Sequence, residues 1–451
     1  TALAAVGRDD AAAPEERPAR LDRRPLVDPP ELSSRDGVLA ATLRVAPGVA
    51  VVDGRRFAAR LYNGSYIPPT LRVRPGDVIR LRLENRTGEV TNFHFHGFNV
   101  SSVGNSDNIF IEVQPGATEH YVVRIPRDHP TGMYWYHPHW HPLVERQVFS
   151  GLSGAIIVEG IERRIPALRG MRQHVMLLKD VQIGRDGRLP QPINSDAPTT
   201  RTVNGQVRPV ITMRPGESQL WRIGNVGADI WYRLRLEGQP FTQVAEDGNP
   251  LAAPWRRREI IMPPGKRAEV VVRGLRPGRY TLRTLRYDQG PQGDTYPERV
   301  LADVVVAGTP ARPVRLPRRL VPFRDLSRAR IARRRVLVFS ENPAGTQFFI
   351  DGRQFSHDRI DQRVRIHTTE EWLLRNISGE LHPFHIHQGD FQVVKVNGRP
   401  VTAHGLMDVV PLPVHGSVTI RMRFDDPRRF VYHCHILAHE DAGMMGTVLV
   451  S

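Results

Sequence analysis

The sequence predicts an all-β protein of three tandem Greek-key β-sandwich domains, and a long-period internal repeat is the main reason. Three stretches share one pattern: an Asn-Gly or Asp-Gly turn, then alternating apolar and polar residues, then a strand that ends at an asparagine. The turns begin at Asn63, Asn204 and Asp351. The period is therefore about 150 residues, the length of a domain rather than of a solenoid repeat.

The second half of each unit repeats as well. Segments that begin at Pro115, Pro264 and His415 each predict a strand, a turn and a second strand. Short alternating strands between Gly, Pro and Asn turns, with almost no helical periodicity, are typical of β-sandwiches.

The repeat also divides the chain. We expect, in order, a flexible tail (1–37), a first domain (38–162), a second domain (163–308), a linker (309–330) and a third domain (331–451). The linker contains the Pro/Arg-rich stretch TPARPVRLPRRLVPF, which is typical of a segment that wraps between domains. The tail has no initiator methionine and no charged segment before an apolar core. We expect it to be what remains of a removed export signal, or an artificial boundary.

Composition excludes several classes of protein. Hydrophobic residues make up 40% of the chain, which is enough for proper cores. The longest apolar runs stay below about eighteen residues, so we expect no membrane span. The net charge is +16, but the 63 basic residues are spread along the chain instead of forming the patch typical of a nucleic-acid binder. We therefore expect no nucleic-acid partner. The single cysteine excludes an internal disulfide.

Four His-x-His pairs occupy corresponding places in the first and third units. Counted from the strand-ending asparagines, His94 and His385 fall where the second unit has Leu234. At the other end of the unit, YHPH and YHCH correspond to YTLR at 280–283, which has no histidine. The paired histidines are His94, His96, His137, His139, His385, His387, His433 and His435. Chance would not remove all four positions from one copy and keep them in the other two.

Strand geometry indicates how such pairs bind metal. One pair alone is more often a surface or packing feature, but four in register favour metal binding. Residues i and i+2 of a strand lie on one face about 6.6 Å apart, which suits two metals of one cluster better than one compact site. Neutral imidazole suits copper, iron and zinc. We expect a cluster between the first and third domains, with the second domain as a metal-free spacer. His141 has no counterpart in YHCH and is left outside the cluster.

The only cysteine, Cys434, lies between His433 and His435, so on a strand its side chain points to the opposite face. It cannot join their cluster, but it can bind a separate metal one peptide away. Two histidines, one cysteine and a distant methionine form the trigonal copper site of electron-transfer proteins. The candidates are His382, Cys434, His439 and Met444. A nucleophilic thiol would need a base and an oxyanion hole, and zinc would have no use for a methionine.

Four motifs together carry a resemblance to a known family. They are HFHG (94–97), YHPHWH (136–141), HPFHIH (382–387) and HCHILAHEDAGMM (433–445). With them the chain resembles the multicopper oxidases, enzymes of three cupredoxin-like domains that include laccases and bacterial cuprous oxidases. The resemblance extends from about residue 38 onward.

The resemblance implies four copper ions in each chain, with a role for every motif residue. His382, Cys434, His439 and Met444 would hold the type 1 copper, and His94 and His385 the type 2 copper. The type 3 pair would be held by His96, His137, His139, His387, His433 and His435.

The function implied is that of a laccase-like oxidase of phenols and aromatic amines. Electrons from a small reducing substrate would enter through His439, and Cys434 would connect that site to the cluster, where O2 is reduced to water. Asp107 and Glu440 resemble the acidic residues that supply protons in the family. We expect a monomeric bacterial protein that is exported to the periplasm or the cell exterior.

Two other functions stay open. A metallo-oxidase would act on cuprous or ferrous ions, and the bacterial cuprous oxidases carry a methionine-rich insertion. The nine methionines here are scattered apart from Met444 and Met445, which favours organic substrates. A copper-free relative acting as a scaffold would be expected to have lost ligands, whereas every ligand position is filled.

Overall fold

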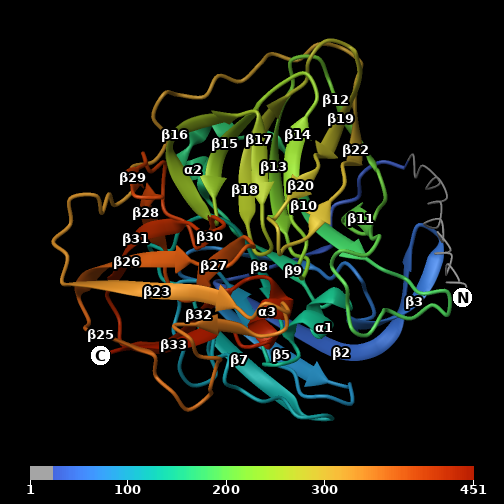
Figure 1. The fold of residues 1–451 in the computed structure, drawn as a ribbon. Coiled ribbons are helices and arrows are strands. Elements are labelled where there is room, and N and C mark those ends of the chain that lie inside the picture. Colours follow the sequence, from blue (N-terminus) through green and yellow to red (C-terminus); the bar gives the residue numbers. More distant parts are fainter. Residues whose placement is uncertain (1–23) are drawn as a thin grey trace, which may run out of the picture.

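The computed structural model describes residues 24–451, which form three pairs of β-sheets, one pair for each predicted sandwich (Figure 1). The predicted fold class, all-β with three tandem cupredoxin-like Greek-key sandwiches, is confirmed. Within residues 24–451 the helical elements are short: α1 (Val144–Phe149), α2 (Ile161–Arg164), the 3-10 turn η1 (Pro166–Leu168) and α3 (Leu437–Asp441).

The first sandwich packs a five-stranded sheet on a four-stranded sheet. The order of the five-stranded sheet is β1 (Glu31–Ser33), β4 (Thr70–Val73), β9 (Gly154–Val158), β8 (Gly132–His137) and β6 (His94–His96). The order of the four-stranded sheet is β3 (Arg55–Tyr62), β2 (Val38–Val52), β5 (Val78–Asn85) and β7 (Thr118–Arg124).

The second sandwich has six-stranded and five-stranded sheets. The order of the larger is β11 (Thr200–Val203), β10 (Arg172–Val181), β13 (Ser218–Asn225), β18 (Arg267–Arg273), β15 (Phe241–Glu246) and β16 (Asn249–Arg257). The order of the smaller is β12 (Val210–Met213), β22 (Arg299–Val306), β19 (Gly278–Thr284), β14 (Tyr232–Leu236) and β17 (Glu259–Met262). A small ribbon is formed by β20 (Tyr287–Asp288) and β21 (Thr295–Tyr296).

The third sandwich repeats this arrangement. Its six-stranded sheet has the order β24 (Phe348–Ile350), β23 (Arg333–Glu341), β26 (Thr368–Asn376), β31 (Ser417–Phe424), β28 (Phe391–Val396) and β29 (Arg399–Pro400). Its five-stranded sheet has the order β25 (Gln362–Val364), β33 (Met445–Val450), β32 (Arg428–Cys434), β27 (His382–Ile386) and β30 (Val409–Leu412).

Strand pairing shows the same repeat that the sequence shows. The long first strand of each unit runs parallel to a later strand, as β2 does to β5, β10 to β13 and β23 to β26. Each of those later strands then pairs antiparallel with a third, β7, β18 or β31. Each sandwich has its own apolar core, because the alternating strands bury one face between the two sheets. Representative core residues are Leu81, Phe95, Trp221, Val270, Trp372 and Ile420.

The strand register corrects one correspondence between the units. His94 of β6 lies opposite His137 of β8, and His385 of β27 lies opposite His433 of β32. In the second unit Leu234 lies opposite Thr284, so Thr284 is the counterpart of His137, and YTLR ends one residue before it. The conclusion that the second unit has no histidine at this place is unchanged.

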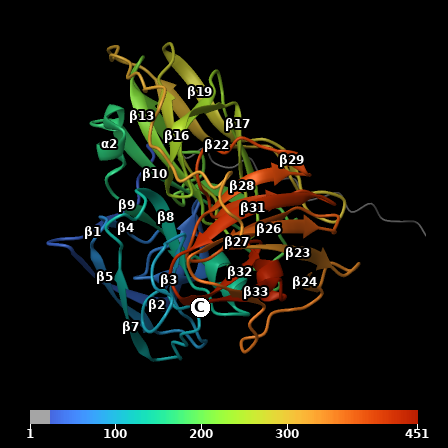
Figure 2. The same cartoon turned by 90° about the vertical axis from the view of Figure 1, so that its left-hand side faces the viewer.

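The three domains form a compact triangle in which the second lies above the first and third (Figures 1 and 2). The first and third domains lie side by side, and β8 and β27 approach each other at the centre. A buried lysine fixes the second domain on the first. The Lys179 ammonium of β10 donates hydrogen bonds of 3.0 to 3.2 Å to the carbonyls of Tyr66, Gly151 and Ser153.

The expected flexible tail is partly wrong. Residues 1–23 lie outside the described residues, but 24–37 are built into the fold: β1 extends the sheet of the first domain by parallel pairing with β4. Pro25 bridges to Val210, and Leu26 is buried in the core of the second sandwich. The composition of residues 24–37 predicts no regular structure, but main-chain pairing with two sheet edges orders this segment.

The segment between β22 and β23 contains no helix or strand. Its Leu320 and Val321 amides donate to the carbonyls of Ala252 and Leu251, so it runs against the second domain. Among residues 24–451, none of the helices combines the length and the apolar character needed to cross a bilayer.

Candidate metal centres

The eight paired histidines come together where the first and third domains meet, and all are buried. The pairing of β6 with β8, and of β27 with β32, places two His-bearing strand pairs face to face. The His94 ring stacks on His387 at a centroid distance of 4.0 Å, and the His96 ring stacks on His385 at 3.9 Å. In HFH and HIH, the first histidine of one motif thus stacks on the second histidine of the other. The two motifs are therefore related by a local two-fold axis.

Donor atoms divide the eight histidines into two groups of three and a remaining pair. The groups are His96, His137 and His435, then His139, His387 and His433, each with ligand atoms within 4.8 Å of one another. The remaining pair, His94 and His385, lies with His96 in a further such group. Each group takes residues from both domains. Apart from this further group, which contains both His94 and His96, the two histidines of each His-x-His pair lie in different groups.

Main-chain carbonyls set the tautomer of several rings. A carbonyl only accepts hydrogen bonds, so the Nδ1 atoms of His137, His385 and His433 carry hydrogens, which they donate to the carbonyls of Pro138, Asp408 and Cys434 at 2.8 to 2.9 Å. Their Nε2 atoms are then bare lone pairs. That of His433 lies 3.3 Å from His139 Nε2 and 3.2 Å from His387 Nε2.

Buried lone pairs that converge in this way need a cation. The Nε2 atoms of His94, His137 and His385 are buried and have no hydrogen-bond partner in the described part of the chain. Burial first, and neighbouring imidazoles second, lower the pKa of most of these rings, to about 3 for His435. These rings are therefore neutral near pH 7, the form that binds metal. The donor set fits transition-metal ions.

The cysteine site lies on the other face of β32. Cys434 Sγ lies 3.7 Å from the Nδ1 atoms of His382 and His439, which are 3.3 Å apart. All three residues are buried, and Phe384 and Ile436 are part of the same apolar core. Burial raises the pKa of the Cys434 thiol well above its usual range. A bound metal would have to displace that proton.

The short helix α3 explains how His439 and Met444 return to Cys434. Asp229 and Ala228 of the second domain accept the amides of Ala438 and Leu437 at the start of the helix. Gly443, with φ +107°, ends it, as a left-handed residue after a helix commonly does. The Met444 amide then donates to the His439 carbonyl at 2.9 Å, and its own carbonyl accepts the Cys434 amide at 3.0 Å. Met444 is fully buried in the same core.

The two predicted proton-transfer carboxylates lie against the histidines. Asp107 Oδ1 accepts hydrogen bonds from His94 Nδ1 at 2.9 Å and from the Phe95 amide at 3.0 Å. Glu440 is fully buried, with its oxygens 2.9 Å from His433 Nδ1 and 3.4 Å from His139 Nδ1. Neither Glu440 oxygen accepts a hydrogen bond within the described residues.

Comparison with protein-family models identifies the family to which this chain belongs. Three models described as multicopper oxidase match residues 45–163, 183–301 and 332–451. The chain belongs to the multicopper oxidase family. The buried, neutral imidazole groups and the cysteine set are therefore copper-binding candidates, and the metal predicted from the donor types is the one that the family uses.

Relatives of this multicopper oxidase cover nearly all of it. The multicopper oxidase mco of Staphylococcus aureus is 26% identical over 94% of this chain and 91% of its own. The cell division protein FtsP of Escherichia coli is also 26% identical, over 98% and 95%. A multicopper oxidase from Campylobacter jejuni, described as a metallo-oxidase, superimposes with a TM-score of 0.85 at 26% identity over 95% of both chains. A laccase from Pediococcus acidilactici gives 0.84 at 27% identity over 96% and 95%.

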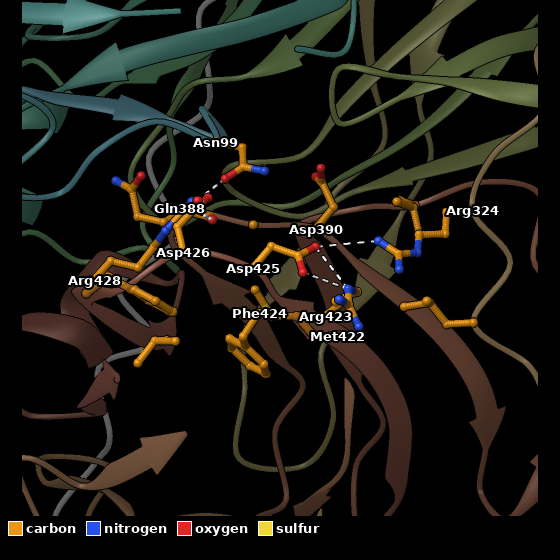
Figure 3. Close-up of a pocket in the computed structure, with 15 residues that line it drawn as sticks. Asn99, Arg324, Gln388, Asp390, Met422, Arg423, Phe424, Asp425, Asp426 and Arg428 are labelled. Carbon is orange, nitrogen blue, oxygen red and sulfur yellow. Dashed lines mark hydrogen bonds and ion pairs between the residues drawn. The ribbon is translucent and has the colours of Figure 1, made fainter. Parts of the chain in front are cut away.

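A pocket of about 160 Å³ is lined mainly by the third domain, with Asn99 from the first, and includes Gln388, the residue after His387 (Figure 3). Asn99, Gln388 and Arg428 lie together in it, and Arg428 donates to the Asn99 side chain and the Gln388 carbonyl at 2.6 Å. Gln388 Nε2 in turn donates to Asp107 Oδ2 at 2.7 Å. Solvent in this pocket is thus one side chain away from Asp107.

Several residues at the site were not predicted from the sequence. Ser378 Oγ is 2.7 Å from His382 Nε2, Glu380 Oε2 is 3.6 Å from His439 Nε2, and Phe348 stacks on His439 at 3.8 Å. Asp408 contacts the cluster through its carbonyl. The only available signal was that Ser378 and Glu380 immediately precede the HPFHIH motif. His141 lies outside the donor groups, with its Nδ1 4.0 Å from Asp441 Oδ1.

We expect Asp107→Ala to weaken copper binding by the His94/His385 pair. The alanine removes the acceptor that holds the His94 ring with Nε2 facing the cluster, and loss of such partners costs roughly 10- to 100-fold in metal affinity. Copper titration of the metal-free protein measures the effect. Asp128→Ala, an exposed carboxylate of the same domain, is the control. Equal affinities in the two variants would contradict the role of Asp107.

Proposed function

We propose that this multicopper oxidase is a laccase-like enzyme that takes single electrons from phenols or aromatic amines and passes them to O2, which is reduced to water. One observation carries the proposal. Cys434 shares a donor set with His382 and His439, while its two peptide neighbours, His433 and His435, belong to different imidazole groups. The two sites are therefore joined by a few covalent bonds, the connection that an electron-transfer oxidase needs.

The donor groups support four copper ions in each chain. We assign a type 1 copper to His382, Cys434, His439 and Met444, and a type 2 copper to His94 and His385. The type 3 pair is assigned to His96, His137 and His435, and to His139, His387 and His433. When bound, copper supplies one-electron chemistry at the cysteine site and the binding and reduction of O2 at the histidine cluster.

The side chains around the two sites have three further roles: excluding water, receiving electrons and supplying protons. Phe384 and Ile436 exclude water from the cysteine site, and His439 offers the donor-side edge, with 7% of its surface exposed. Glu440 lies between His433 and His139, and its oxygens have no hydrogen-bond partner among residues 24–451, which supports a role in proton transfer. Asp107 orients His94 at Nδ1 and connects through Gln388 to the pocket of Figure 3, which supports a role in proton supply.

A metallo-oxidase is the second candidate, and a group of carboxylates favours it. Glu380 lies 3.6 Å from His439 Nε2. Burial, followed by the negative charges of Glu341 and Asp294, raises the pKa of Glu380 to about 9. A cation bound there would relieve this repulsion next to the exposed edge of His439. The scattered methionines favour an organic substrate instead.

The substrate class is tested by comparing kcat/KM for a phenol, a radical-forming dye, Cu(I) and Fe(II), with O2 uptake as the signal. Glu380→Gln removes the charge but keeps the size of the side chain. We expect it to leave the phenol value within about twofold if substrates are organic. A loss confined to the metal ions would establish the metallo-oxidase. Asp358→Asn, an exposed carboxylate of the same domain, is the control. Absence of O2 uptake with all four donors in the copper-loaded protein would contradict both candidates.

A copper-free scaffold function is disfavoured, because each of the twelve positions carries a donor. We further propose that the protein is an exported monomer, working in the periplasm or outside the cell, where free copper is tolerated. Cell fractionation and light scattering test these two points.

A further inference from the structure

The turn between β17 and β18 of the second domain lies against the histidine cluster, although this domain supplies none of the donor groups found in residues 24–451. Gly265 in this turn has φ +83°. A Cβ added there would lie 2.9 Å from His435 Nε2 and 3.1 Å from His96 Cε1. The turn therefore packs bare backbone on two imidazoles of one group, and any side chain larger than glycine would displace them.

Arg267, the first residue of β18, connects this turn to the third domain. Its guanidinium is fully buried and forms a bidentate pair with Asp408, both hydrogen bonds measuring 2.7 Å. It also donates to the carbonyls of Gly265 at 3.0 Å and of Met133, in the first domain, at 3.3 Å. One side chain thus holds parts of all three domains in a single geometry, as the planar fork of arginine allows.

Asp408 passes this geometry on to the histidines. Its main-chain carbonyl accepts the Nδ1 hydrogen of His385 at 2.8 Å. Its carboxylate Oδ1 lies 3.6 Å from His96 Nε2 and 3.8 Å from His385 Nδ1. The position of Asp408 therefore determines which way the His385 ring faces, and its charge lies beside two ligands.

A second carboxylate of the second domain fixes the main chain at the same place. Asp247 Oδ2 accepts the amides of Asp408 and Val409 at 3.2 Å. The Lys266 ammonium donates to Asp247 at 2.8 Å and to the Val409 carbonyl at 2.9 Å. Asp408 is thus held at its amide by Asp247 and at its carboxylate by Arg267, so the second domain determines both ends of the residue.

We infer that the second domain positions the ligands of the trinuclear copper site, formed by the type 2 and type 3 coppers together. Arg267 acts through Asp408 on His385, and the Gly265 backbone acts on His96 and His435. The inference rests on the proposed copper assignment and goes beyond it, because the second domain becomes a part of the metal site instead of a spacer. Arg267 is a positioning residue: it touches neither copper nor substrate, and its effect reaches the metal through the Asp408–His385 hydrogen bond.

The test compares two buried arginines of the same sheet. Arg222 of β13 pairs with Glu269 at 2.7 Å and is as buried as Arg267, but its side-chain partners lie away from the histidines. Arg267→Lys and Arg222→Lys both keep the positive charge but lose the planar guanidinium that can donate two parallel hydrogen bonds. Copper content, the electron paramagnetic resonance spectrum and the thermal unfolding midpoint of the copper-loaded proteins are then measured.

We expect both variants to lower the unfolding midpoint, while only Arg267→Lys alters the type 2 copper spectrum and weakens copper binding there by roughly 10- to 100-fold. The blue absorption of the cysteine site serves as an internal reference and stays at the wild-type value in both. Wild-type copper content and spectrum in Arg267→Lys would overturn the inference. A wild-type protein without blue absorption would instead overturn the proposed function.

Asp408→Asn and Gly265→Ala keep the inference testable if Arg267→Lys does not fold. Asp408→Asn retains the carbonyl that holds His385 but removes the negative charge 3.8 Å from the Nδ1 atom of this type 2 ligand, so we expect a shifted type 2 spectrum at full copper content. Gly265→Ala presses on His96 and His435, so we expect loss of type 3 copper with the type 2 signal retained. Unchanged spectra and copper content in these two variants would also overturn the inference.

Discussion

Replacing Cys434 with serine is expected to abolish the intense blue absorption and all measurable O2 uptake with reducing substrates, while the histidine cluster still loads copper. Serine keeps the approximate volume in the buried site, but its hydroxyl offers no thiolate, the soft ligand that a trigonal electron-transfer copper site requires. The covalent connection to His433 and His435 remains, but the donor set at its other end is lost. Absorption spectroscopy, copper analysis and oxygen-electrode measurements follow the three effects separately.

Met445→Leu is the matched control for Cys434→Ser. Met445 is equally buried on the next strand, directly opposite His433, and is not among the residues that we assign to copper. Its replacement is close to volume-conserving, so we expect the colour and the turnover to remain. A Cys434→Ser protein that stays blue would show that the type 1 site lies elsewhere.

Glu440→Gln is expected to retain the blue colour and rapid reduction of the cysteine site, while steady-state O2 turnover falls by about 10²- to 10⁴-fold, the usual contribution of a proton-transfer group. Glutamine has nearly the same shape but no transferable proton. Because Glu440 lies between His433 and His139 without another partner, no neighbouring side chain substitutes for it. Stopped-flow reduction and steady-state O2 uptake separate electron entry from turnover.

Asp441→Asn is the control for the neighbouring position. Asp441 accepts the amides of Val144 and Glu145 at the start of α1, so its role is to hold the first domain on the third. We expect that variant to lose some stability and to keep its turnover. Wild-type turnover in Glu440→Gln would remove Glu440 from the mechanism and leave Asp107 as the remaining candidate.

The fold and the donor groups could be predicted because both depend on local sequence patterns. Strand alternation and the repeated turns predict the three sandwiches. The period of two along a strand predicts that His433 and His435 serve different metals and that Cys434 faces away from both. The register between strands is harder to predict from sequence. Aligning Tyr280 with Tyr136 placed the second unit three residues out of register, because the two tyrosines are not at equivalent positions in their sheets.

Contacts between domains could not be predicted. Arg267, Asp408 and His385 are far apart in the chain, and a Pro-Gly turn like the one at Gly265 occurs in the first unit as well, at Gly116, away from the cluster. Nothing in the residue types distinguishes the copy that packs on the imidazoles. The tautomers depend on carbonyls, such as that of Pro138, which every residue possesses. The burial of residues 24–37 likewise depends on sheet edges that only the folded chain provides.

The division of the histidine groups between the first and third domains has a consequence for how the protein is made. No domain contains a complete group by itself, since His96 and His137 need His435, and His387 and His433 need His139. During synthesis the cluster therefore cannot form until β32 has been made and the third domain has docked on the first. Copper would therefore bind only after the whole chain has been made, and bound copper would stabilise the contact between the first and third domains.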